Sequence, residues 1–253
     1  MTALEVVPLQ GLPLISAGDD LVELIASALK LNGVTPRAGD VLVVAQKIVS
    51  KAEGRIVDLA TIEPSAQAVA LAADVDKDPR LVEVILSESV RVVRARRGVL
   101  IVEHRLGFIM ANAGVDQSNV APADGSRRVL LLPENPDRSA ETLRRGLAAV
   151  TGIDVAVVIN DSFGRPRQGT ASVAIGVASL PALIDLRGRP DLFGRRLEVS
   201  VIGFADEIAA AASLLMGQAD EALPVVLIRG LRWSAPESTA ASIVRPPNED
   251  LFR

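Results

Sequence analysis

A run of five apolar residues, Val155-Ala156-Val157-Val158-Ile159, predicts a buried strand that ends at the polar pair Asn160-Asp161. A second run, Val41-Leu42-Val43-Val44, predicts another short buried strand, bounded by Gly39-Asp40 and by the polar Gln46-Lys47. In both places a strand delivers polar side chains directly after an apolar run. These two junctions are therefore the first places to search for chemistry.

Other strands and helices are predicted around these two runs. Asp20 and Glu23 have the spacing of a capping box and begin a helix that ends at Asn32-Gly33. Between residues 64 and 88 the helical pattern breaks at Asp78-Pro79, because proline disfavours helix in the residue before it. Strands in clusters with helices between them predict an α+β fold with mixed or antiparallel sheets and flanking helices, in preference to a regular βαβ winding. The remaining predicted elements are a strand at 3–9, an antiparallel meander at 90–95, 99–103 and 106–110, a helix at 136–150 that ends at Gly152, strands near 171–177 and 197–202, a helix at 205–216 and a strand at 225–228.

The composition restricts the class of protein. The chain has 253 residues, 49% apolar and 23% charged, which excludes a disordered chain and allows one large domain or two interleaved smaller ones. The longest apolar stretch is far shorter than the ~18 residues of a membrane span. Residues 1–20 show no signal peptide, and the absence of cysteine excludes disulfides and thiolate metal sites, so we expect a cytoplasmic protein without a membrane partner.

Several kinds of site are excluded by missing features. The sequence contains neither a G-x-x-x-x-G-K-[ST] P-loop nor a strand followed by G-x-G-x-x-G. His104 is the only histidine, which excludes a multi-histidine metal site, and we expect it to be structural. A net charge of −4 and 2% aromatic residues argue against a nucleic-acid partner.

Lysine is rare in this chain, yet two lysines lie together after a predicted strand. Lys47 and Lys51 belong to Gln46-Lys47-Ile48-Val49-Ser50-Lys51, whereas the whole chain has 4 lysines against 23 arginines. A compact ammonium group at the end of a buried strand suits contact with a phosphate. A solvated turn would explain the same residues, because lysine is mostly exposed in proteins. The spacing leaves both interpretations open.

Oxygen-bearing side chains gather in two segments. Asn112-Ala113-Gly114-Val115-Asp116-Gln117-Ser118-Asn119 combines a glycine with several oxygen donors, and Asp161-Ser162 follows the second buried strand. Hard cations such as Mg²⁺ prefer carboxylate, water and phosphate oxygens. The alternative is that these residues only cap turns, which is a common role of Asp and Asn.

Two more segments carry chemistry in one interpretation and only local structure in another. Residues 161–170 contain Arg165 and Arg167 between glycines, and the planar fork of arginine could clamp an anionic substrate, although a solvated basic loop is equally ordinary. Met216-Gly217-Gln218 ends an alanine-rich helix and leads into a predicted strand, where a simple glycine C-cap is the alternative to a functional loop.

Taken together, the blocks resemble the coenzyme F-420:L-glutamate ligase family. Their common order along most of the chain makes the resemblance far more specific than any single block. The matching blocks are Gly11-Leu12-Pro13-Leu14-Ile15 with Gly18-Asp19-Asp20, the stretch from Ala45-Gln46-Lys47 to Gly54-Arg55, Asn112 through Asn119, Asn160-Asp161-Ser162-Phe163-Gly164-Arg165-Pro166, Ala205-Asp206-Glu207-Ile208-Ala209, Met216-Gly217-Gln218, and Pro224 to Gly230.

The resemblance implies a GTP-dependent ligase that adds L-glutamate to the lactyl carboxylate of the deazaflavin F-420-0 through an acyl phosphate and releases GDP and phosphate. It implies two divalent ions, Mn²⁺ or Mg²⁺, with K⁺ as a further activator, and two interwoven subdomains in a homodimer. Residues 1–245 would form the ligase domain and 246–253 a C-terminal tail. Two-domain members continue into a flavin-binding reductase domain at this tail, and we expect ligase activity alone here.

The resemblance also implies the site. Asp116, Asp161, Ser162 and Gln218 would be metal ligands. Lys47 is the candidate for contact with the transferred phosphate, because positioning and electrostatics carry most of phosphoryl-transfer catalysis, and Arg165 is a candidate anchor for an anionic group of the substrate. The residues implied to border GTP are Leu12, Pro13, Leu14, Ile15, Lys47, Asn119, Met216, Gly217, Gln218, Ala219, Asp220, Glu221, Ala222 and Leu223.

Two other functions fit the same residues. One is an amino-acid ligase that acts on a modified F-420 precursor or on another carboxylate. The other is a nucleotide- or deazaflavin-binding module without turnover, which a site with the two carboxylates Asp116 and Asp161 disfavours, because binding alone rarely needs such a metal site.

Overall fold

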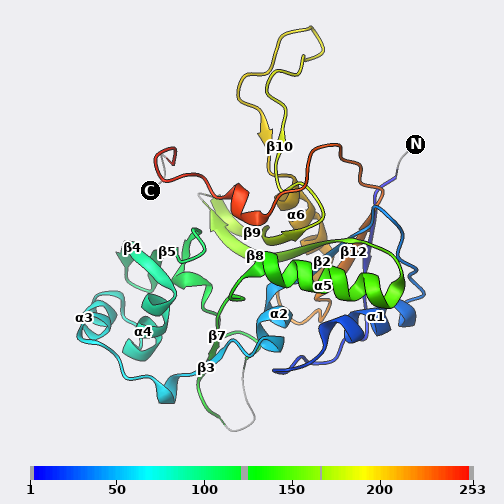
Figure 1. Cartoon of the computed structure of the whole chain (residues 1–253). Coiled ribbons are helices and arrows are strands. Elements are labelled where there is room, and N and C mark those ends of the chain that lie inside the picture. The colour runs from blue at the N-terminus through cyan, green and yellow to red at the C-terminus, as the bar shows by residue number, and fades with distance from the viewer. Residues whose placement is uncertain (1–2, 121–124, 166, 251–253) are drawn as a thin grey trace.

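A mixed five-stranded sheet forms the centre of the molecule (Figure 1), with the strand order β1-β12-β2-β8-β9. The computed structural model describes residues 3–120, 125–165 and 167–250, with Arg165 and Arg167 described at the backbone only. Strands β2 and β8 are parallel, and the other neighbouring pairs are antiparallel, which confirms the expected α+β fold with mixed sheets. The strands are β1 (Glu5–Pro8), β12 (Val225–Arg229), β2 (Val41–Ala45), β8 (Ala156–Arg165) and β9 (Arg167–Ala178).

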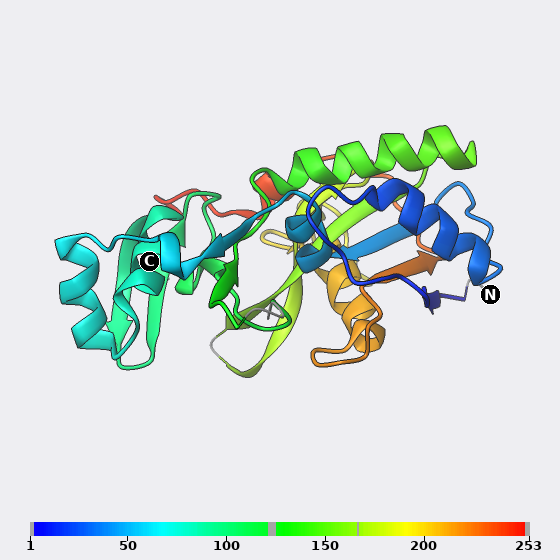
Figure 2. The same cartoon turned by 90° about the horizontal axis from the view of Figure 1, so that it is seen from below.

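Helices cover both faces of this sheet (Figure 2). Successive side chains of a strand point to opposite faces, so Leu42 and Val44 enter one hydrophobic layer while Val41 and Val43 enter the other. Burial on both faces explains why the two apolar runs contain no polar residue. In the part of the chain that the structure describes, no helix is long and apolar enough to cross a membrane. The helices are α1 (Leu21–Leu31), α2 (Gln46–Ala52) and α5 (Pro136–Thr151) on the first face and α6 (Phe204–Met216) on the second.

The helix ends follow the predicted signals. The Asp20 carboxylate caps α1 by accepting the backbone N–H groups of Val22 and Glu23. Gly152 has a φ of 74° and ends α5 in the left-handed conformation that glycine adopts without strain.

A third hydrophobic cluster lies at one end of the central sheet (Figure 1). The predicted break at Asp78-Pro79 separates its two helices, and its strands form the expected antiparallel meander. An antiparallel pair that the sequence patterns did not indicate, β3 with β7, connects it to the centre. Its elements are α3 (Ala66–Val75), α4 (Pro79–Ser87), β4 (Ser89–Arg96), β5 (Val99–His104) and β6 (Ile109–Ala111), with β3 (Ile56–Asp58), β7 (Arg128–Leu130) and the short 3-10 helices η1 (Leu59–Thr61) and η2 (Asn112–Gly114).

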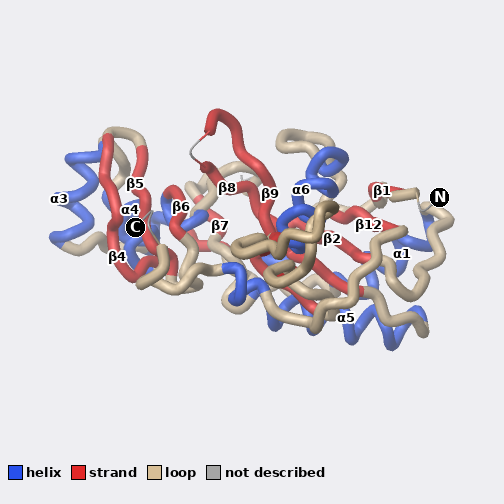
Figure 3. Tube along the Cα trace, turned by 90° about the horizontal axis from the view of Figure 1, so that it is seen from above, coloured by secondary structure: helices blue, strands red, loops and turns tan. Residues whose placement is uncertain are grey.

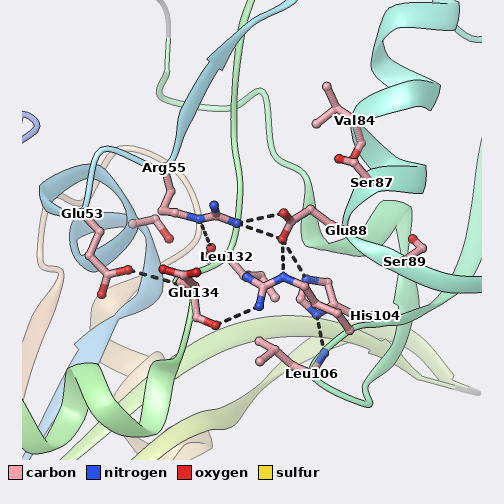
Figure 4. Close-up of polar contacts among 12 residues, drawn as sticks. Glu53, Arg55, Val84, Ser87, Glu88, Ser89, His104, Leu106, Leu132 and Glu134 are labelled. Carbon is pink, nitrogen blue, oxygen red and sulfur yellow. Dashed lines mark hydrogen bonds and ion pairs between the residues drawn. The ribbon is translucent and has the colours of Figure 1, made fainter. Parts of the chain in front are cut away.

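A group of charged side chains joins this third cluster to the rest of the molecule (Figure 4). The Glu88 carboxylate accepts two hydrogen bonds from Arg55 Nη2, at 3.0 and 2.9 Å, and one from Arg105 Nε at 3.0 Å. His104 Nδ1 accepts the Leu106 N–H, so the ring proton belongs on Nε2, which lies 3.5 Å from Glu88 Oε2. Burial acts to raise the pKa of Glu88, but His104 and the two arginines outweigh it and hold the pKa at about 2. His104 is fully buried in this group and has a structural role, as expected.

The structure corrects the sequence prediction at both junctions. β8 does not end at Asn160-Asp161 but continues to Arg165 and pairs with β9, so residues 161–165 and 167–170 belong to paired strands rather than to an open loop. The hairpin runs on past the other strands (Figure 3). Pairing with β9 satisfies the backbone of residues whose own preference is for turns. Gln46 and Lys47 begin α2 and do not form a turn.

A long hairpin arm leaves the body of the molecule (Figure 1). It begins at β10 (Ile184–Asp185) and returns at β11 (Val201–Ile202), so the strand predicted near 197–202 is limited to two residues. Leu192 and Phe193, in the middle of the arm's sequence, are 99% and 95% exposed. Exposed apolar side chains grouped in this way are typical of an interaction surface. The two interwoven subdomains, the homodimer and the boundary at residue 245 stay predictions.

Candidate active site

The candidate site lies where β2 and β8 end side by side. The two strands are parallel and Ala45 pairs with Asn160, so Gln46-Lys47 and Asp161-Ser162 are delivered to the same edge of the sheet. Ligands of open α/β sheets commonly bind beyond the carboxyl ends of the strands. The parallel pair thus brings together two segments that are more than a hundred residues apart in the sequence.

Lys47 and Asp116 form an ion pair at this edge, with 2.8 Å between Lys47 Nζ and Asp116 Oδ2. The Lys47 ammonium also donates to Ser118 Oγ at 2.6 Å. The Asp116 carboxylate accepts the Ser118 backbone N–H at 2.7 Å and its hydroxyl at 3.0 Å. Burial acts to raise the pKa of Asp116, but the hydrogen bonds from Lys47 and Ser118 outweigh it and lower the pKa. Asp116 is therefore held as a carboxylate.

The backbone before Asp116 adopts an unusual conformation that places this carboxylate. Asn112, Ala113 and Gly114 all have positive φ, at 52°, 53° and 67°. A Cβ at Gly114 would lie 2.8 Å from Met110 Cε, so the close packing of the turn requires glycine. Non-glycine residues in this conformation are strained and tend to occur at functional sites.

Asp161 lies close to the same ion pair. Withdrawal of its carboxyl group from water raises its pKa to about 7, and the negative charge of Asp116 adds to this effect. Three contacts act to lower the pKa of Asp161: the Ser162 N–H, the charge of Lys47 and a hydrogen bond from Gln46. Asp116 and Asp161 thus lie near the same lysine, and Asp161 is the one of the two that burial makes costly to ionise.

The segment after α6 closes the site from the other side. Ser162 Oγ donates to Gln218 Oε1 at 2.7 Å, so the loop is tied to β8. Gly217 ends α6, with its N–H bonded to the Ser213 carbonyl, and has a φ of 69°. A Cβ at Gly217 would collide with the Glu221 carboxylate, which accepts the Ala219 N–H at 2.8 Å. Glycine is therefore required both for the helix end and for the fold of the loop.

Most of the predicted nucleotide residues line one open cleft between these segments. Asp220 is the one predicted nucleotide residue that does not line it. Asp116, a predicted metal ligand, does not line it either but is paired with Lys47, which does. The backbone of Arg165 ends β8, and its side chain falls outside the described part of the structure. The lining residues include Leu12, Pro13, Leu14, Ile15, Lys47, Asn119, Asp161, Ser162, Met216, Gly217, Gln218, Ala219, Glu221, Ala222 and Leu223.

The oxygens in the cleft fit a hard divalent cation better than a softer metal ion that prefers thiolate or imidazole ligands. Within the described ranges no three His, Asp or Glu side chains group together, so a cation here would use the carboxylates of Asp116 and Asp161 with neutral oxygens. The hydroxyl of Ser162 and the amide oxygen of Gln218 are such donors and already lie side by side. Mg²⁺ and Mn²⁺ prefer this all-oxygen set, usually with water and phosphate.

Comparison with known proteins identifies the family. Residues 11–230 match the family model described as F420-0:Gamma-glutamyl ligase. The chain belongs to this ligase family. It is 46% identical over 253 residues to the coenzyme F420:L-glutamate ligase of Methanothermobacter thermautotrophicus, and the match covers 99% of each chain. It is 47% identical to the protein of the same name from Methanopyrus kandleri, and the match covers 99% of this chain and 97% of the relative. It is 45% identical to the protein of that name from Archaeoglobus fulgidus, and the match covers 98% of this chain and 96% of the relative.

Three further side chains of this F420-0:gamma-glutamyl ligase family member lie at the site beyond the residues given a role. Gln46 is buried, accepts the Ser50 hydroxyl and donates to Asp161. Lys51, which the sequence pairs with Lys47 as a possible phosphate contact, lines the cleft, and its pKa is lowered by burial and by Lys47. The helical spacing of α2 places Lys47 and Lys51, four residues apart, near one another. Ser118, one of the predicted oxygen donors, contacts Lys47.

Proposed function

We propose that the chain is a GTP-dependent ligase that joins L-glutamate to the carboxylate of the deazaflavin F-420-0 and releases GDP and phosphate. The names of its relatives support ligation of L-glutamate to coenzyme F420. The observation that supports the nucleotide and metal parts is that Lys47 and Asp161 line one cleft and that Lys47 is paired there with Asp116.

The cleft supplies the groups that a triphosphate needs. Lys47 and Lys51 place two ammonium groups on one side of α2, next to the carboxyl ends of two strands. Leu12 to Ile15 and residues 216–223 provide apolar and backbone surface for the rest of the nucleotide. Lysine is well suited to this contact because its compact charge binds phosphate as a point charge.

The metal ligands proposed are Asp116, Asp161, Ser162 and Gln218, with Mg²⁺ or Mn²⁺ as the divalent ions and K⁺ as a further activator. When bound, the ions would offset the charge of the phosphates. The raised pKa of Asp161 supports the assignment, because a buried carboxyl group without enough positive charge is the group that a cation would stabilise.

The reaction proposed has two steps. The F-420-0 carboxylate attacks the γ-phosphorus, and the bond from that phosphorus to the GDP oxygen breaks, which gives an acyl phosphate. The glutamate amine then attacks the acyl carbon, phosphate leaves, and the amine loses a proton. Lys47 holds the transferred phosphoryl group, and Arg165 anchors an anionic group of the substrate.

An assay with purified protein, GTP, Mg²⁺ or Mn²⁺, F-420-0 and L-glutamate tests the proposal by mass detection of the product. We expect glutamylated F-420-0 with equimolar phosphate. Asp116→Ala should abolish turnover with the fold retained, whereas Asp74→Ala, an exposed aspartate on α3, should leave it unchanged. Phosphate release without glutamylation would indicate another acceptor, and nucleotide binding without any release would indicate a binding module. Both outcomes contradict the proposal.

The arm supports the predicted homodimer. Leu192, Phe193 and Val199 are 99%, 95% and 85% exposed, and their transfer into an interface would remove apolar side chains from water. Light scattering should give the mass of two chains for the natural sequence and of one chain for Leu192→Ser/Phe193→Ser. Identical masses would exclude the arm as the dimer contact.

A further inference from the structure

A second pocket lies on the β8–β9 hairpin and is mainly apolar. Phe108, Phe163 and Val173 line it together with Ile243 and Val244, which lie after α6 near the end of the described chain. The tail is packed closely here, because a Cβ at Gly107, which also lines the pocket, would lie 3.0 Å from Val244 Cγ1. None of these residues lines the proposed nucleotide cleft.

Two aromatic rings form the wall of this pocket. Phe108 and Phe163 meet edge to face, with 5.4 Å between ring centroids and an interplanar angle of 77°. Both are only partly buried. The chain has only 5 phenylalanines, 1 tryptophan and no tyrosine, so two of its few aromatic side chains lie together in this pocket. An exposed aromatic face is a surface on which a flat ring stacks.

The pocket borders the proposed metal site along the same hairpin. Val173 is the direct cross-strand partner of Asp161, and such partners have Cβ atoms about 5 Å apart. Phe163 follows Asp161 by two residues, so both side chains lie on the same face of β8. Phe108 precedes β6, the strand that leads to Asp116. Each ring thus lies on a segment that also carries one of the two carboxylates.

Polar groups in the pocket add a preference for a particular ring. Asp206 Oδ1 accepts the Ala174 N–H at 2.9 Å, and burial raises the pKa of this carboxyl group. Its second oxygen is available to pair with an imide edge. Arg245 lines the same pocket, is exposed, and makes no ion pair with the described residues. Asp250 lines the pocket as well, so its charged groups are one guanidinium and two carboxyl groups.

We infer that this pocket binds the fused heteroaromatic ring of the carboxylate substrate, with Phe163 and Phe108 against the ring and the anionic chain directed along β8 toward Asp161. The identity of the ring as a deazaflavin rests on the proposed function. The observations themselves support a flat ring with a hydrogen-bond donor on the edge that faces Asp206.

Binding of a ring fragment tests this inference separately from turnover. The probe is the ribityl-deazaflavin that lacks the phospholactyl group, which has no carboxylate to activate. Its fluorescence anisotropy is titrated with the full chain in the absence of GTP and divalent ions. We expect Phe163→Ala to weaken binding about tenfold or more and Phe163→Leu, which keeps apolar volume without the ring, to weaken it less. Val69→Ala, at a half-exposed residue on α3 away from both pockets, is the control and should bind like the natural sequence.

The outcomes separate this inference from the proposed function. Equal affinity of the natural sequence, Phe163→Ala and Phe163→Leu would overturn the pocket assignment, and unchanged KM for F-420-0 in active Phe163 variants would do the same while the ligase function stands. If the natural sequence binds the fragment through Phe163 but forms no glutamylated product, the proposed function fails and the pocket remains. Thermal unfolding shows whether Phe163→Ala folds. If it does not, the affinity of Phe163→Leu for the fragment tests the pocket assignment instead.

Discussion

Replacement of Glu88 by glutamine should destabilise the protein by about 3 kcal/mol at neutral pH. The carboxylate is only 10% exposed and is the shared partner of Arg55, Arg105 and His104. Its pKa falls from 4.5 to about 2 in the folded protein, and at ~1.4 kcal/mol for each tenfold change in acid dissociation this corresponds to roughly 3 kcal/mol. Removal of one partner from a buried ion pair typically has an effect of ~3–5 kcal/mol.

The sign of the pH dependence follows from the lowered pKa. The stabilisation by Glu88 is complete above the unfolded value near 4.5 and is lost as the pH falls toward the folded value of about 2. At pH 3 the ionisation of Glu88 should contribute only ~1.4 kcal/mol, because the folded protein then keeps the charge that the unfolded chain has mostly lost. The difference between the natural sequence and Glu88→Gln should therefore shrink by about 2 kcal/mol between pH 7 and pH 3.

Urea unfolding followed by circular dichroism at both pH values measures this difference. Glu141→Gln is the matched control, because Arg144 and Arg145 also hold the pKa of Glu141 at about 2 while its side chain is 33% exposed on α5. Solvent screens such a pair, so we expect an effect below ~1 kcal/mol there. Equal effects of the two substitutions, or a Glu88→Gln difference that does not shrink in acid, would refute the reasoning from burial.

The active site and the sheet provide three more tests. Asp161→Asn should raise the unfolding temperature in the absence of divalent ions, and the increase should be larger at pH 8 than at pH 5. The pKa of Asp161 is raised from 3.8 to about 7 in the folded protein, so the destabilisation by this carboxyl group grows as the pH rises between these two values. An equal increase at both pH values, measured by thermal unfolding, would contradict this. Lys47→Arg should weaken GTP binding by several-fold in calorimetry even though the charge is kept, since a planar fork cannot reproduce the contacts of Nζ with both Asp116 and Ser118. Gly176→Ala should destabilise the protein by ~1–3 kcal/mol in urea unfolding, because its Cβ would lie 2.3 Å from the Pro136 carbonyl oxygen.

Local signals were sufficient for much of the fold. The cap at Asp20, the break at Asp78-Pro79 and the glycine at 152 act within one helical turn, and the structure confirms all three. The extension of β8 through Asp161 and Ser162 depends on a partner strand that follows in the chain and on the register between them. Residue patterns within β8 contain no information about that pairing, so polar residues after an apolar run were interpreted as the end of the strand.

At the site, a residue that has a local structural role, such as capping a turn or ending a helix, can also contribute to the cleft. Asp116 does cap a turn, by accepting the Ser118 N–H, and it also pairs with Lys47. Gly217 does end α6, and the same residue makes room for the Glu221 carboxylate in the cleft. The spacing of residues could not bring Lys47 and Asp116 together, because 69 positions separate them and only the tertiary fold joins them.

The electrostatics of the site connect cation binding to nucleotide binding. Lys47 is engaged by Asp116 and Ser118, so its ammonium group cannot give its full charge to a phosphate while these contacts persist. Asp161 adds a second carboxyl group nearby, and its pKa is raised by burial and by the charge of Asp116. Positive charge supplied to the two carboxylates would release Lys47 toward the phosphates and lower the pKa of Asp161 in the same event. A site arranged in this way favours a nucleotide that arrives with its cation over a bare one, and it needs no glycine-rich phosphate loop to do so.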